Sequence, residues 1–250
     1  MNATVATLTS RSLLGRRRTL VLLLLPVALL ALCTLARVLA GLDADIRRDL
    51  DGPLAPGLLG AFGIAILMPL LGLIAGTGSI GPEIDEGSIV YLLAKPLNRH
   101  SIVVTKLLVA IGVVTAFGAA PVGIAGVVLT GEVGTVTVAY FLGALAAGIA
   151  YAAVFLLLAV VTRNAVVIGL IYALIWESLV GGLVPGAQAL SIQQWALAVV
   201  REVLGDSAER LEATAAVGFG TGMVLLAVVT VAATVHAGRR LQTLRLNDDS

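Results

Sequence analysis

The chain has 250 residues, of which 59% are hydrophobic and 12% are charged, and its mean hydropathy is +1.05. A water-soluble globular domain carries about 25% charged residues, so this composition excludes a soluble globule and predicts an integral membrane protein. The net charge of +1 gives no indication of a nucleic-acid partner, because in a membrane protein the placement of charges along the chain is what matters. A single cysteine, Cys33, excludes an internal disulfide framework.

Six apolar runs are long enough to cross a bilayer, which takes about 20 residues as a helix. The predicted spans are residues 19–40, 57–80, 102–130, 135–161, 165–184 and 213–237. The sequence therefore predicts one all-α transmembrane domain over residues 1–250, without a soluble domain. Six spans place both termini on the same side of the membrane.

The distribution of Lys and Arg predicts that this side is the cytoplasm, since retained loops carry the positive excess. Eleven of the 16 basic residues fall on the side of the termini: Arg11, Arg16, Arg17, Arg18, Lys95, Arg99, Lys106, Arg163, Arg239, Arg240 and Arg245. The five on the other side are accompanied by nine acids: Asp43, Asp45, Asp49, Asp51, Glu132, Glu202, Asp206, Glu209 and Glu212. We expect a multi-pass protein of the cytoplasmic membrane with both termini inside.

The basic residues before the first span admit two interpretations. Leu8, Arg11, Leu14 and Arg18 lie at helical spacing, so residues 5–18 are expected to lie on the cytoplasmic lipid surface with the arginines near anionic headgroups. Alternatively, the basic run only sets the topology. A cleaved signal peptide is disfavoured, because the apolar run exceeds the 7 to 15 residues typical of a signal core.

The segment between the second and third spans predicts a short cytoplasmic helix over residues 82–94. Pro82 suits the first helical position, and Pro96 disfavours a helical backbone at Lys95. Acidic residues occupy the first turns, where the helix dipole favours them: Glu83, Asp85 and Glu86. This helix is about 20 Å long, too short and too polar to span. One face is apolar, so the helix either docks on a partner or lies solvated at the interface; Gly87 in mid-helix suggests close approach of another backbone.

The motif of this segment resembles a known signature. It reads Glu83-x-x-x-Gly87-Ser88-Ile89-x-x-Leu92-Leu93-Ala94-Lys95-Pro96-Leu97-x-Arg99, followed by Lys106-Leu107-Leu108. This is similar to the ABC-2-type exporter permeases, which read E-x-x-x-G-T-I-x-x-L-L-S-x-P-I-x-R and then G-K-L. Ser88 stands where Thr is usual, and Thr105 where Gly often precedes the lysine. The basic amphipathic N-terminus, the six spans, the Trp176-Glu177 pair and Ser191-Ile192 extend the resemblance along the chain.

The resemblance implies a subunit driven by a separate ATPase. In that family the cytoplasmic segment is the coupling helix, which docks on the ATP-hydrolysing subunit, and two permease copies, or one copy and a homologue, face each other. The coupling residues carried over are Glu83, Asp85, Glu86, Gly87, Ser88, Lys95, Pro96 and Arg99. The chain itself has no G-x-x-x-x-G-K-[ST] loop, so ATP and Mg²⁺ are expected on the partner, with no cofactor or metal in this chain.

Glu177 lies inside the fifth span, where a carboxylate is costly and is expected to be functional or paired. It either lines the translocation path or dimer interface with Trp176, or it lies near the outer surface as a hydrated, structural group. Residues 185–212 beyond it predict one or two short external helices, with Trp195 as an interfacial anchor. By resemblance, Ser191 and Trp195 belong to an external gate.

Other functional classes have weaker support. No catalytic motif or metal-ligand cluster appears, so an intramembrane enzyme is disfavoured. An ion-driven secondary transporter usually places several ionisable groups near the midplane, whereas this chain offers mainly Glu177. A scaffold without transport activity is the other alternative.

The apolar, glycine-rich bundle suits a hydrophobic or amphipathic cargo. Small residues such as Gly143 and Gly148 are expected to serve helix packing.

Overall fold

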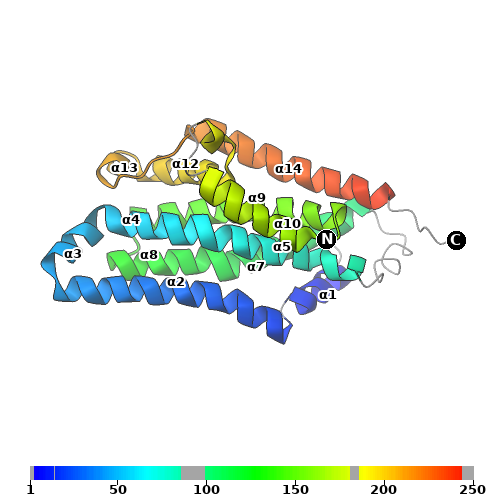
Figure 1. Ribbon diagram of the computed structural model, residues 1–250, viewed down its shortest axis with the longest axis horizontal. Helices are drawn as coiled ribbons and strands as arrows, with labels where there is room; N and C mark the ends of the chain where they lie inside the picture. Colours follow the sequence, from blue (N-terminus) through cyan, green and yellow to red (C-terminus); the bar gives the residue numbers. More distant parts are fainter. Residues whose placement is uncertain (1–2, 14, 86–98, 181–185, 244–250) are drawn as a thin grey trace.

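A computed structural model describes residues 3–13, 15–85, 99–180 and 186–243. Every regular element in these ranges is helical, which confirms the prediction of an all-α protein for the part of the chain described. The long helices lie along one axis, and both ends of the chain lie at the same end of the bundle (Figure 1).

The N-terminal half contains the first three membrane-crossing stretches. Its elements are α1 (Ala3–Leu13), α2 (Arg16–Leu42), α3 (Ala44–Asp49), η1 (Leu50–Leu54), α4 (Ala55–Leu58), η2 (Leu59–Leu67), α5 (Met68–Asp85), α7 (Arg99–Val114), η3 (Thr115–Ala119) and α8 (Ala120–Thr130). The backbone of Gly52, just before Pro53, is not helical, so α3 is kinked away from the long stretch that begins at α4. Helix α3 lies at the end of the bundle opposite the termini (Figure 1).

The C-terminal half contains the central helix and the elements around it. These are α9 (Thr135–Val161), α10 (Ala165–Ile171), η4 (Tyr172–Val180), η5 (Ala187–Leu190), α12 (Ile192–Leu204), α13 (Ser207–Arg210) and α14 (Phe219–Thr243). The short helices η5, α12 and α13 occupy the region in which external helices are expected. Helix α14 begins at Phe219, six residues after the expected start of the last span. The intervening backbone is held by α12 instead, since the Ala216 amide donates to Gln194 Oε1 at 3.1 Å.

Within the described ranges, five helical stretches are long and apolar enough to cross a membrane. They are Leu22–Leu42, Ala44–Ile84, His100–Thr130, Thr135–Val161 and Phe219–Leu241, and Ala165–Glu177 is a shorter apolar helix. The chain is therefore a multi-span membrane protein.

Pro82 lies inside α5, so the helix does not begin there, contrary to expectation. The residue before a proline is normally driven out of the helical region by a clash that involves its Cβ. Gly81 has no Cβ, which lessens this clash, and the helix continues through Pro82 to Asp85, as α2 continues through Pro26. Residues 86–98, and with them most of the expected helix over 82–94, lie outside the described ranges.

Helix α9 forms the centre of the bundle, and its closest neighbour is α5. A methyl group added at Gly76 would lie 2.8 Å from the Ala152 carbonyl oxygen and 2.9 Å from the Leu156 amide nitrogen. One added at Gly72 would lie 2.5 Å from Tyr151 Cβ. The two glycines are four residues apart, as in the small-x-x-x-small pattern that lets membrane helices approach closely. Gly143 and Gly148 on α9 are also closely packed, against the side chains of Val200 and Val114, which agrees with the packing role expected for them.

We predict that Gly76→Ala destabilises the permease fold, because the added methyl group meets the backbone of α9 and one helix must move. Overpacking of this kind costs about 1–3 kcal/mol. The matched control is Gly112→Ala on α7, where no atom lies within 4 Å of the added group. Thermal unfolding of the purified protein in detergent should show a lower midpoint for Gly76→Ala only. Equal midpoints for the two variants would contradict the close contact.

Candidate functional site

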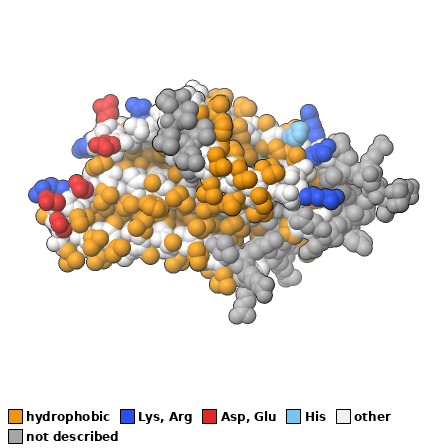
Figure 2. Space-filling model, in the orientation of Figure 1, with side chains coloured by type: hydrophobic (Ala, Val, Ile, Leu, Met, Phe, Trp, Pro, Cys, Tyr) orange, Lys and Arg blue, Asp and Glu red, His pale blue; other side chains and the backbone are white. Residues whose placement is uncertain are grey.

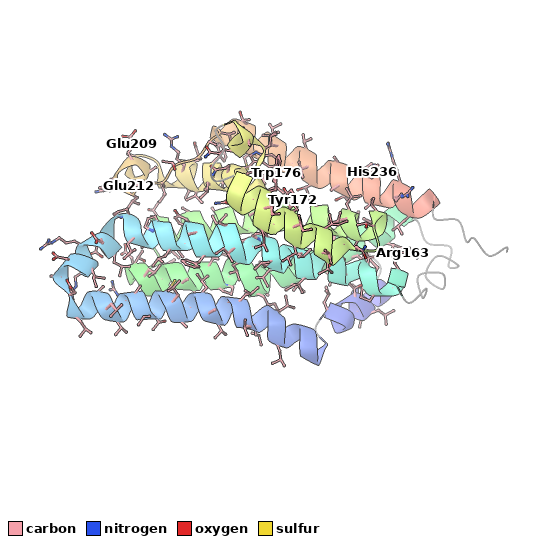
Figure 3. The ribbon with its side chains drawn as sticks, in the orientation of Figure 1. Arg163, Tyr172, Trp176, Glu209, Glu212 and His236 are labelled. Atoms are coloured by element: carbon pink, nitrogen blue, oxygen red, sulfur yellow. The ribbon has the colours of Figure 1, made fainter. Side chains whose placement is uncertain are left out.

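The described charges are concentrated at the two ends of the bundle. Figure 2 shows an apolar middle, with acidic side chains at one end of the visible face and only Lys, Arg and His side chains among the coloured charges at the other. Glu209 and Glu212 mark the first end, and Arg163 and His236 mark the second, where both termini lie (Figure 3). This is the distribution expected of a bundle whose termini lie in the cytoplasm.

A fully buried lysine joins three helices at the end that carries the termini. Lys106 on α7 is 0% exposed. Its Nζ donates to Glu83 Oε1 at 2.7 Å, to the Ser79 carbonyl oxygen at 2.7 Å, and to Thr9 Oγ1 at 3.3 Å. Glu83 and Ser79 belong to α5, and Thr9 belongs to α1. We call these four residues the Lys106 node.

The node brings together two charges that would be costly apart. The Lys106 side chain is 0% exposed and the Glu83 side chain is 27% exposed. Removing the carboxylate would leave the buried ammonium group without its counter-charge. The node thus ties α1, α5 and α7 together.

The expected coupling residues are described only in part. Glu83 is in place, and its side chain is 27% exposed. Asp85 and Arg99 are the last and first residues of α5 and α7. The other members lie outside the described ranges: Glu86, Gly87, Ser88, Lys95 and Pro96. Lys106 is part of the motif but was not among the predicted site residues. A lysine inside a long apolar run is nevertheless a signal of a paired or functional charge.

A buried carboxylate lies nearer the opposite end. Glu177 in η4 is 0% exposed. Its Oε1 accepts from the Tyr172 hydroxyl at 2.9 Å and from the Ile192 amide at 3.1 Å, while its Oε2 accepts from the Ser191 hydroxyl and from the Gln193 amide at 3.3 Å. Because Ser191 is the N-cap residue of α12, the carboxylate binds the N-terminus of that helix, where negative charge is favoured.

This geometry bears on both interpretations of Glu177. The carboxylate is buried within the chain and is not at a hydrated surface, and both of its oxygens are occupied by donors of the same chain. Trp176, its neighbour, is only half-buried.

Trp195 is 4% exposed and donates from Nε1 to the Ala189 carbonyl oxygen at 2.7 Å, so it packs inside the chain and is not the interfacial anchor that we expected. Its place on α12 faces the core because α12 packs on α9 and α14.

The comparison with known families agrees with the apolar helical stretches. The family described as ABC-2 family transporter protein matches residues 4–243. The chain belongs to this family. No curated protein matches it. The ABC-2 resemblance seen in the cytoplasmic motif is thereby confirmed, and the chain is a membrane transporter permease.

A groove opens on this ABC-2 permease at the end that carries the termini. It has a volume of about 520 Å³ and lies between α5 and the corner at which α9 ends and α10 begins. Its lining on α5 includes Leu73, Ile74 and Thr77, and its lining at the corner includes Arg163 and Val167. Grooves of this size are large enough for a small molecule.

We predict that Glu177→Gln loosens the N-terminus of α12. The glutamine keeps the shape, but it loses the charge and turns an NH₂ group toward one of the donors, and hydrogen bonds to charged groups contribute about 1.5–3 kcal/mol each. Hydrogen–deuterium exchange at the Ile192 and Gln193 amides should become about tenfold faster or more. Glu209→Gln, an exposed acid on α13, is the control and should leave this exchange unchanged. Unchanged protection in Glu177→Gln would show that the carboxylate does not hold the helix.

Proposed function

We propose that the chain is the membrane-spanning subunit of an ATP-binding-cassette exporter, driven by a separate ATPase and paired with a second copy of itself or a homologous permease. In this proposal it crosses the cytoplasmic membrane six times with both termini inside. Its cargo is hydrophobic or amphipathic.

The Lys106 node is the observation that carries this proposal. Residues 86–98, where the motif predicts docking of the ATPase, directly connect the end of α5 to the start of α7. Glu83 and Lys106 join these two helices just inside the membrane at 2.7 Å, and Thr9 adds α1. If the ATPase displaced the coupling segment, α1, α5 and α7 would therefore move together. Such rigid-body transmission suits a switch between inward-open and outward-open states.

The fifth and sixth spans of the proposal follow from α10, η4 and α14. Helices α10 and η4 cover residues 165–180, which is about 24 Å at the α-helical rise. The hydrocarbon core is about 30 Å thick, so the proposal requires residues 181–184 to complete this span. With α14 as the last span, the basic end of Figure 2 faces the cytoplasm.

The Glu177 geometry favours this function over an ion-driven transporter. A proton-coupled transporter uses an intramembrane acid or histidine that gains and loses its proton during the cycle. Both oxygens of Glu177 instead accept two hydrogen bonds each from the chain, two of which come from the backbone of α12. An anion bound to a helix N-terminus is suited to holding that helix in place.

We predict that Glu83→Gln and Lys106→Met uncouple ATP hydrolysis from transport. With the co-expressed ATPase in proteoliposomes, transport should fall about tenfold or more while ATP hydrolysis continues, because the coupling segment is no longer tied to α7. Glu132→Gln, an exposed acid at the opposite end, is the control and should retain transport. Gly87→Trp, which would block close approach of the ATPase, should have the same uncoupling effect.

Two results would count against the proposal. If no ATPase co-purifies with the permease under any condition, the two-part exporter is wrong. If transport survives Glu83→Gln, Lys106→Met and Gly87→Trp at normal protein amounts, an ATPase is present but does not act through this segment. Because Glu83→Gln leaves the fully buried Lys106 without its counter-charge and lowers the amount of folded protein, Lys106→Met, which leaves a partly exposed carboxylate, is the deciding variant.

A further inference from the structure

The groove beside α5 has the depth of one membrane leaflet. Its lining on α5 runs from Pro82 to Leu73, which corresponds to about 13 Å along the helix at 1.5 Å per residue. Half of the hydrocarbon core is about 15 Å. In the proposed orientation, the groove therefore extends from the cytoplasmic surface to near the middle of the bilayer.

Its lining changes from polar to apolar with depth. Thr162, Arg163 and Asn164 form the rim at the corner between α9 and α10. Leu73 and Ile74 form the inner end on α5. The side of the groove is also open: Val166 is 58% exposed and Val167 is 59% exposed, so a molecule in the surrounding lipid can reach it laterally. This gradient matches a molecule with a polar head and an apolar tail.

One positive charge dominates the rim. Among the described residues that line the groove, Arg163 is the only one with an ionisable side chain, and no described side chain forms an ion pair with it. The charge distribution of the bundle explains why an arginine stands at this end, but not why it stands beside an apolar groove. A guanidinium binds carboxylate and phosphate groups with two parallel hydrogen bonds, and the amide of Asn164 adds a donor next to it.

We propose that this groove binds an anionic amphiphile from the cytoplasmic leaflet. The acidic group, a carboxylate or a phosphate, lies against Arg163 and Asn164, and the hydrocarbon tail lies along Leu73, Ile74 and Val167. A resident phospholipid and an exported amphiphile share this chemistry. Binding itself is independent of the proposed function, whereas the role of the groove as the entry site for cargo rests on it.

The binding test uses the permease alone, in nanodiscs of phosphatidylcholine. The probe is a long-chain fatty acid that carries a dansyl group at its far end, and the comparison is its uncharged methyl ester; empty nanodiscs give the background partition. The acid should bind saturably and more tightly than the ester. Arg163→Gln should weaken binding of the acid about tenfold or more and leave the ester unchanged, because a charge-assisted hydrogen bond is lost.

Two variants separate the charge from the space. Arg239→Gln removes an exposed arginine at the same end of the bundle, on α14 and outside the groove lining, and should leave binding of the acid unchanged. Val167→Trp fills the groove and should weaken binding of both the acid and the ester. If the acid and the ester bind equally, or if Arg163→Gln binds the acid as tightly as the unmodified chain, the proposal is wrong.

A second arm distinguishes the two sources of the amphiphile. Displacement of the acid by added phosphatidylglycerol, with export unaffected by Arg163→Gln, would support the groove as a site for a resident lipid. Loss of ATP-driven export of the acid in Arg163→Gln, in proteoliposomes with the ATPase, would support it as the cargo entry. If binding follows the expected pattern but the unmodified chain shows no ATP-driven export, the binding site is supported and the proposed exporter function is contradicted.

Discussion

The structure depends on a constraint of its solvent: a charged group inside a bilayer must find its partners within the protein. Two charges in this permease meet that constraint in different ways. Lys106 is satisfied by groups of two other helices, α1 and α5, and Glu177 is satisfied by two hydroxyls and two backbone amides. Each charge therefore determines how separate elements are joined. The lysine joins the helices at the end proposed to be cytoplasmic, and the glutamate joins η4 to α12.

Much of the fold can be predicted from the sequence, because hydrophobic length is a strong signal in a membrane protein. The run over residues 135–161 has the same bounds as α9, where glycine and threonine border an uninterrupted apolar stretch. Local signals were less reliable where tertiary contacts compete with them. Pro82 carries the usual signature of a helix start, yet α5 continues through it, because proline is tolerated within membrane helices and the preceding glycine lessens the clash that favours a break.

The candidate site was predictable in its residue types but not in its contacts. The motif drew attention to Glu83 and Lys106, but their 23-residue separation gives no indication that they meet at 2.7 Å. Glu177 was expected to be functional or paired because of its position in an apolar run. Two of its four donors could not be found from residue type, because they are backbone amides of α12, which every residue except proline carries. Trp195 was misplaced for a related reason: an aromatic residue suits both a lipid interface and a buried helix face, and only the packing of α12 decides between them.

The glycine contact between α5 and α9 limits how this permease can change shape. Side chains that interdigitate can exchange rotamers and allow two helices to slide, but backbones in direct contact at Gly72 and Gly76 leave no such freedom. Helices α5 and α9 therefore form one rigid unit, and the groove lies along its edge. In the proposed function, a displacement of α5 would then carry α9 with it, and the shape of the groove would change only through α10, the wall that is not part of that pair.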